Sequence, residues 1–265
     1  MGLVDWLRLK LARNSAKRPS AVELYALMRD ARIKILDGRY EGAAEALVRP
    51  LRERAEIEDP AIVDYLIQSL GTAWILSDRY EDSISFFNKH IEKFPDDAEA
   101  YHERGCAYWY SGQLDKAIFD YSRTLELRSG RILALSGRGQ VYAEAGSPEE
   151  ALQDLNKALK LIEAADKSEE ASRLWHEEIE AFVRNGKALA LGVLGQFTES
   201  MAEFEYSLKL SPNNAWAFYN RAVVNEKRGR IDLAYADYAL ALEKKQPHLN
   251  LIRRRRAEEK LATIR

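Results

Sequence analysis

The sequence predicts an all-α solenoid in which helical hairpins stack side by side. The first observation is a period of 34 residues, because Gly105 and Gly112 recur as Gly139 and Gly146. The second is that each period holds two amphipathic helical runs separated by a short turn, as in residues 98–131. A fixed period of this length with two helices per unit is typical of stacked-repeat architectures.

Residues 98–131 also carry a defined pattern of residue types. A bulky residue, a small residue, an aromatic, a glycine, an alanine and a second aromatic stand at positions 4, 8, 11, 15, 20 and 24, respectively: Tyr101, Gly105, Tyr108, Gly112, Ala117 and Tyr121. This pattern resembles the tetratricopeptide repeat family, although Ser129 replaces the proline that often closes the repeat. The resemblance covers residues 24–248 and implies a right-handed superhelical solenoid of six repeats.

Residues 24–165 contain four of these repeats. Residues 1–20 are expected to form a basic amphipathic helix and a linker, and repeats one to four occupy residues 24–57, 64–97, 98–131 and 132–165. A six-residue insertion precedes repeat two. Asp59 and Pro60 supply an N-cap and a first-turn proline there, which predicts a lengthened first helix.

A second insertion, residues 166–180, separates repeats four and five. It continues an apolar face at helical spacing and therefore predicts an over-long first helix for repeat five. Leu174 and Trp175 on this overhang are a candidate secondary docking surface. Repeats five and six follow at residues 181–214 and 215–248, and residues 249–265 are expected to cap the last repeat.

Composition limits the class of protein. Apolar residues make up 46% and charged residues 31%, which excludes a disordered chain. The single cysteine, Cys106, excludes an internal disulfide framework, and no apolar run approaches the length of a transmembrane helix. The first residues do not resemble a secretory signal, so we expect a cytoplasmic protein.

The charges are distributed unevenly. Residues 1–20 carry a net charge of +4 and residues 243–265 carry +5, which leaves −11 for the residues between them. An acidic body argues against a nucleic-acid groove along the solenoid. Arg253–Arg256 is the most basic run, and its four side chains point around the whole helix. We expect a solvated capping helix, with contact to an acidic partner or anionic lipid as the alternative.

The N-terminal segment has three open interpretations. Leu3, Leu7 and Leu11 form an apolar stripe, with Trp6 beside it, and basic residues lie elsewhere on the helix. The helix could cover the exposed edge of repeat one, dock residues 1–13 on a membrane surface or a partner, or fill the groove of the solenoid itself.

The resemblance assigns a second helical stripe to a concave groove. The expected groove residues are Tyr65, Gln68, Thr72, His102, Cys106, Trp109, Tyr110, Gln140, Asn185, Trp216 and Tyr219. Aromatic side chains left open to water in such numbers mark a binding site, so the groove is expected to bind a peptide or partner helix. The alternative is that the aromatics pack on one another.

One function of the family is argued against. Members that bind the free carboxylate of chaperone tails need lysine, asparagine and arginine at fixed positions of three consecutive repeats. Here those places hold other residues: Gln68, Thr72, Glu99, His102, Glu103, Cys106, Leu133, Ser136, Gly137 and Gln140.

Chemical motifs are lacking in the sequence. The four histidines stand apart from one another and from Cys106, so we expect no metal site and no cofactor. Neither a phosphate-binding glycine loop nor a nucleophile elbow occurs. The sequence therefore predicts a non-catalytic interaction scaffold. An RNA-binding helical-repeat protein and a membrane-surface assembly factor are the alternatives.

Overall fold

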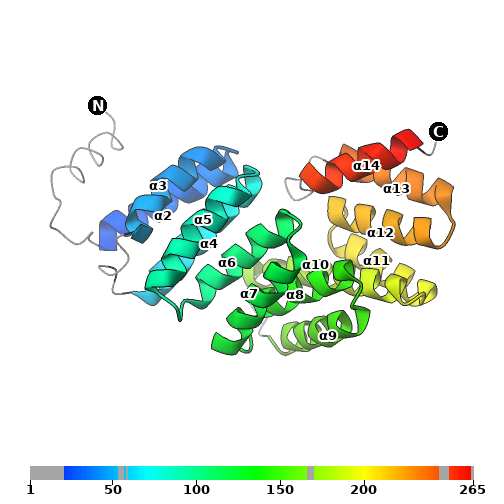
Figure 1. Cartoon of the computed structure of the whole chain (residues 1–265), viewed down its shortest axis with the longest axis horizontal. Coiled ribbons are helices and arrows are strands. Elements are labelled where there is room, and N and C mark those ends of the chain that lie inside the picture. The colour runs from blue at the N-terminus through cyan, green and yellow to red at the C-terminus, as the bar shows by residue number, and fades with distance from the viewer. Residues whose placement is uncertain (1–20, 53–56, 58, 166–169, 245–250, 264–265) are drawn as a thin grey trace. The chain divides into compact units, whose positions relative to one another are not determined.

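A computed structural model describes residues 21–52, 57, 59–165, 170–244 and 251–263 (Figure 1). The described residues form thirteen helices and no strand, so the expected all-α class is confirmed. The chain divides into two compact units, Met1–Ala73 and Trp74–Arg265, and each is described by itself. The predicted helix in residues 1–20 lies outside the described residues.

The first unit contains the hairpin of repeat one. Helices α2 (Ala21–Leu36) and α3 (Tyr40–Arg52) pack together, with Leu24 and Ala31 of α2 and Leu47 of α3 in the core. Helix α4 (Pro60–Leu76) starts in this unit and continues into the second. The carboxylate of Asp59 accepts a hydrogen bond from the Ala61 backbone N–H at 2.9 Å, which satisfies a free donor at the start of the helix.

The second unit consists of hairpins in chain order. Its helices are α5 (Tyr80–Lys93), α6 (Ala98–Tyr110), α7 (Leu114–Leu127), α8 (Ile132–Ala145), α9 (Pro148–Ala164), α10 (Glu170–Val193), α11 (Phe197–Leu210), α12 (Ala215–Lys227), α13 (Ile231–Glu243) and α14 (Leu251–Thr263). Helix α6 pairs with α7, α8 with α9, α10 with α11 and α12 with α13 (Figure 1). The first helices of these hairpins also contact their neighbours in a row, from α6 to α8, α10 and α12.

Turns of one kind join the two helices of each hairpin. Gly112 and Gly146 have φ values of 80° and 82°, a left-handed conformation that glycine adopts without steric cost. The N–H of the residue after Gly112 donates to the Tyr108 carbonyl at 2.8 Å, as in a Schellman motif. In repeat two Asp78 takes this place with φ 56°. The first helices α6 and α8 are therefore each followed by a left-handed glycine.

Small residues allow the helices of a hairpin to approach closely. A Cβ atom added to Gly139 of α8 would lie 2.6 Å from Cγ of Leu155 and 3.3 Å from the Ala151 carbonyl oxygen, both on α9. Any side chain at this position would therefore push α8 and α9 apart.

A partly buried ion pair joins the two helices in each of the four hairpins from α6 to α13, and the sequence pattern did not identify it. Arg104 donates from Nε and one terminal nitrogen to both oxygens of Asp120, each at 2.7 Å. The same contact recurs at the same spacing in other repeats: Arg138 with Asp154, Lys187 with Glu203 and Arg221 with Asp237. A two-point arginine–carboxylate contact fixes orientation as well as distance.

Helix α10 is longer than the other first helices of the unit. It has 24 residues, against 13 in α6 and α12, and it begins inside the insertion at residues 166–180. Residues 166–169 lie outside the described part. Within the described residues, no helix combines the length and the apolar character needed to cross a membrane.

Replacing Gly139 with valine tests the close approach of α8 and α9. We expect Gly139→Val to lower the free energy of unfolding by about 1–3 kcal/mol, because the new side chain overlaps Leu155. Gly130→Val is the matched control, since nothing lies within 4 Å of a Cβ atom at that exposed position. Urea denaturation followed by circular dichroism measures both, and an equal loss in the two variants would contradict the packing described.

Candidate functional site

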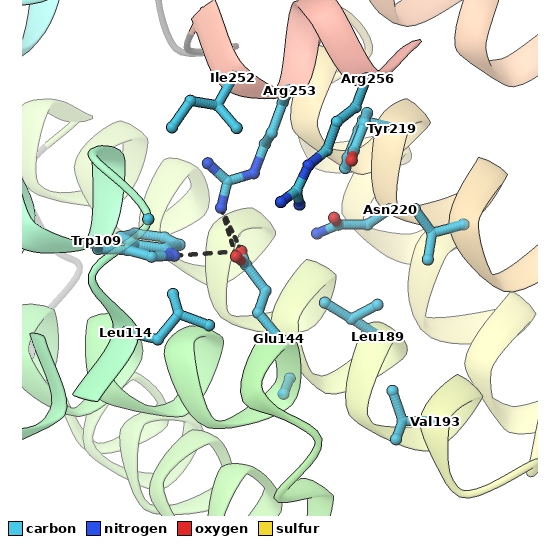
Figure 2. Close-up of a pocket in the computed structure, with 13 residues that line it drawn as sticks. Trp109, Leu114, Glu144, Leu189, Val193, Tyr219, Asn220, Ile252, Arg253 and Arg256 are labelled. Carbon is cyan, nitrogen blue, oxygen red and sulfur yellow. Dashed lines mark hydrogen bonds and ion pairs between the residues drawn. The ribbon is translucent and has the colours of Figure 1, made fainter. Parts of the chain in front are cut away.

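Helix α14 packs against α13, and Arg253 near its start reaches side chains of the first helices α6, α8 and α12. We call the surface beneath α14 the inner face, defined by Trp109, Glu144, Leu189, Tyr219, Asn220 and Glu226, which come from α6, α8, α10 and α12. Between this face and α14 is a cavity of about 330 Å³ (Figure 2). The side chains of Ile252, Arg253 and Arg256 line it from the α14 side.

Arg253 is the central contact between α14 and the inner face. The residue is 5% exposed, and one terminal nitrogen donates to both oxygens of Glu144, at 2.5 and 2.6 Å. Its guanidinium lies 4.1 Å from the ring centroid of Trp216 and 5.5 Å from that of Trp109. A planar cation on aromatic faces, paired with a carboxylate, is a favourable arrangement for arginine.

Trp109, Glu144 and Trp216 also contact one another, and we call these three residues the arginine clamp. The indole N–H of Trp109 donates to Glu144 Oε1 at 3.2 Å, as Figure 2 shows. The two tryptophan rings meet edge to face, with centroids 4.6 Å apart. The clamp therefore brings together three hairpins, because its members come from α6, α8 and α12.

The predicted groove aromatics of the second unit are covered. Trp109 and Trp216 are each 3% exposed, and Tyr219 is also buried. Tyr110 is half-buried against Trp216, and burial raises the pKa of its hydroxyl. The expectation that these rings line an open groove is corrected, because they pack on one another and under α14. This is the alternative that the sequence left open.

Two predicted groove residues tie neighbouring hairpins together. Gln140 of α8 donates to the Phe182 carbonyl of α10 at 2.7 Å. Asn185 of α10 accepts from the side-chain amide of Asn220 on α12 at 3.2 Å. Gln140 and Asn185 are both fully buried, so the expectation that they face a ligand is corrected as well.

His102 and Cys106 lie in the interior of repeat three. Nε2 of His102 is 3.7 Å from the sulfur of Cys106, which accepts a hydrogen bond from the Tyr121 hydroxyl at 3.2 Å. Burial lowers the pKa of His102 and raises the pKa of the Cys106 thiol. The thiol therefore stays protonated, and the pair lacks the thiolate that nucleophilic chemistry needs.

Glu103 sits beside this pair and titrates unusually. The pKa of Glu103 is raised to about 8, mainly because the group is buried and to a smaller extent because the carboxylate of Glu99 is nearby. Glu99 itself is fully buried and accepts hydrogen bonds from Arg131, one at 2.5 Å, and from Arg128 at 2.9 Å. Glu103 is therefore mostly neutral at pH 7, and Glu99 is paired.

The remaining predicted site residues lie elsewhere. Tyr65 and Gln68 are half-buried and Thr72 is exposed, all on α4 in the first unit, so their membership of a groove stays a prediction. Trp175 of α10 is 46% exposed, and the side chain of Leu174 lies outside the described part. The secondary docking surface also stays a prediction.

Two residues of the inner face were missed from the sequence. Glu144 stands at position 13 of its repeat, a groove position in the resembling family, but the groove prediction took only Gln140 from that helix. Glu226 of α12, which pairs with Lys260 of α14, was missed in the same way. Among the described residues, no three of the His, Cys, Asp and Glu side chains gather in a way that could hold a metal ion.

Comparison with known proteins agrees with this architecture. The family described as "Tetratricopeptide repeat" matches residues 102–169 and 185–248. The chain is a tetratricopeptide repeat protein. Its repeats form a scaffold of the protein-interaction type, which the family uses to bind proteins or peptides.

Individual relatives are distant. The chain is 27% identical over 186 residues to human "Tetratricopeptide repeat protein 13", which covers 67% of this chain and 20% of that protein. It is 21% identical over 248 residues to bovine "DnaJ homolog subfamily C member 3", which covers 81% of this chain and 47% of that protein. The chain thus spans less than half the length of either. A tetratricopeptide repeat protein from Parabacteroides merdae has a similar fold, with TM-score 0.50 and 18% identity over 91% of this chain and 98% of that one.

Trp109→Ala tests whether this ring belongs to the core. We expect a loss of about 3–5 kcal/mol in the free energy of unfolding, because a nearly inaccessible indole is removed. Trp175→Ala is the control and should change stability little, since that ring is 46% exposed. Unchanged stability in Trp109→Ala would place the ring on an open surface.

Glu103→Gln tests the buried carboxyl group. The folded state raises the pKa of Glu103 from 4.5 to about 8. The free energy of unfolding of the wild-type chain therefore falls as the pH rises from 4.5 to about 8. We expect the variant to match the wild type near pH 5 and to exceed it at pH 9 by on the order of 3 kcal/mol. Thermal melts of both proteins across this range measure the difference, and two parallel pH profiles would contradict it.

Proposed function

We propose that this chain is a non-catalytic adaptor that binds a helical segment of a protein partner on the inner face. The observation that carries the proposal is that this face already holds a helix, α14, through the arginine clamp. The row of first helices thus offers a surface whose shape and charge suit an amphipathic helix.

The charges of the inner face favour a basic partner. Glu144 pairs with Arg253, and Glu226 pairs with Lys260 further along α14. Two carboxylates spaced along one helix-binding surface attract cationic side chains and repel phosphates. This supports a protein ligand over RNA, in line with the acidic body of the chain.

Burial of the reactive groups supports the absence of catalysis. In the described residues of repeat three, the pKa of the half-buried Cys106 thiol is raised and His102 is buried, which disfavours both as reactive groups. We also propose the cytoplasm as the location, since a chain with one cysteine needs no oxidising compartment for an internal disulfide.

Site-specific photo-crosslinking tests the proposed face. The crosslinking residue benzoylphenylalanine replaces Leu114 or Val193, which line the cavity, and in control proteins it replaces Phe119 or Tyr206, which are exposed on the second helices α7 and α11. We expect partner crosslinks at the two inner positions in at least about fivefold higher yield, because a helix on this face shields little of the other helices. Equal or higher yields at the control positions would refute the proposed face.

A further inference from the structure

The arginine clamp has features of a recognition site, and its present occupant is a segment of the same chain. We infer that α14 is an intramolecular stand-in for the ligand, and that the partner is an arginine-bearing helix that replaces Arg253 in the clamp. This inference rests on the proposed function and names the chemical class of its partner.

The clamp is organised by contacts among its own members. The Trp109 indole donates to Glu144, and the two tryptophan rings touch edge to face, without any contribution from α14. A site that keeps its geometry when empty loses less entropy when a ligand binds. Its two ring faces and one carboxylate match the planar guanidinium of arginine better than the compact ammonium of lysine.

Outside the clamp, α14 packs against α13 and contributes few buried side chains to that contact. Among its described side chains only Arg253 and Ala257 are buried, and Ile252 and Leu261 are half-buried. Its remaining inner-face ion pair, Lys260 with Glu226, is partly exposed and therefore contributes little. An element with so few buried apolar contacts opens at a lower free energy than the hairpins beneath it.

If Arg253 left the clamp, the carboxylate of Glu144 would lose its cation. The Glu144 side chain is 20% exposed, and within the clamp it would keep the hydrogen bond from the Trp109 indole. A partly buried carboxylate that loses its cation is destabilised, so the vacated clamp favours binding of a second guanidinium. The same competition explains how α14 would lower the apparent affinity of the wild-type chain for its partner.

The four consecutive arginines provide a matched test on one helix. The full-length chain is prepared as wild type, Arg253→Ala and Arg254→Ala, because Arg254 is exposed while Arg253 occupies the clamp. The probe is a fluorescent synthetic peptide with the sequence of residues 251–263. We expect Arg253→Ala to bind it at least about tenfold more tightly than the wild type and Arg254→Ala, since only that variant vacates the clamp.

Substitutions in the peptide and in Glu144 test whether the arginine side chain and its carboxylate partner account for the affinity. A peptide with lysine in place of Arg253 should bind the Arg253→Ala chain about fivefold more weakly, and one with alanine there should not bind measurably. Adding Glu144→Gln to the Arg253→Ala chain should remove the gain. Circular dichroism checks that each variant folds, and Arg253→Met is the second variant if Arg253→Ala does not.

The inference is overturned if vacating the clamp gives no gain in affinity, or if the alanine peptide binds as tightly as the original. Crosslinks at Leu114 and Val193 together with either result would leave the proposed function standing and remove only the arginine-bearing partner. Crosslinks confined to Phe119 and Tyr206 would instead remove the inner face as the site of binding.

Discussion

The close approach of helices at small residues is the constraint on which the second unit depends. Gly139 allows α8 to lie against α9, and Gly192 of α10 leaves room for Val224 of α12, which would be 2.4 Å from an added Cβ atom. Because the first helices then lie in a row, residues distant in sequence meet on one surface. Trp109 and Glu144 are 35 positions apart, and Glu144 and Arg253 are 109 apart. The clamp is therefore a product of the stacking and not of any single repeat.

Electrostatics has two roles in this unit. The ion pairs inside the hairpins, such as Arg138 with Asp154, hold two helices of one repeat in register. The pair between Glu144 and Arg253 uses the same chemistry between a repeat and the helix that follows the last repeat. The first kind lies within a repeat, whereas the second joins a repeat to the helix that follows the last repeat, and the proposal assigns the exchange with a partner to the second.

Much of the fold could be predicted from the sequence because it is periodic. The 34-residue spacing of Gly112 and Gly146 predicted hairpins with a short turn, and both glycines lie in such turns with a left-handed backbone. The apolar face that runs to Phe182 predicted a long first helix in repeat five, where α10 has 24 residues. These features depend on local chemistry that recurs every 34 residues, so a single sequence contains enough information.

The candidate site could be predicted only in part. Helical spacing placed Trp109 and Trp216 on the inner stripe, but it could not show that α14 returns over them, since that contact is set by tertiary packing. The four arginines of α14 are also equivalent in the sequence, and only the orientation of the helix selects Arg253. Glu144 stands at a groove position of its repeat, but a carboxylate near a helix end is most often solvated. The sequence therefore gave no reason to predict its contact with α14.

The most direct test of the account is amide hydrogen exchange in α14 of the full-length chain. The account predicts that Arg253→Ala makes the α14 amides exchange at rates near those of an isolated helix, while α8 and α12 keep their wild-type protection. Arg254→Ala should leave all three helices unchanged. If the α14 amides remain as protected in Arg253→Ala as in the wild type, the clamp does not hold this helix and the account is wrong.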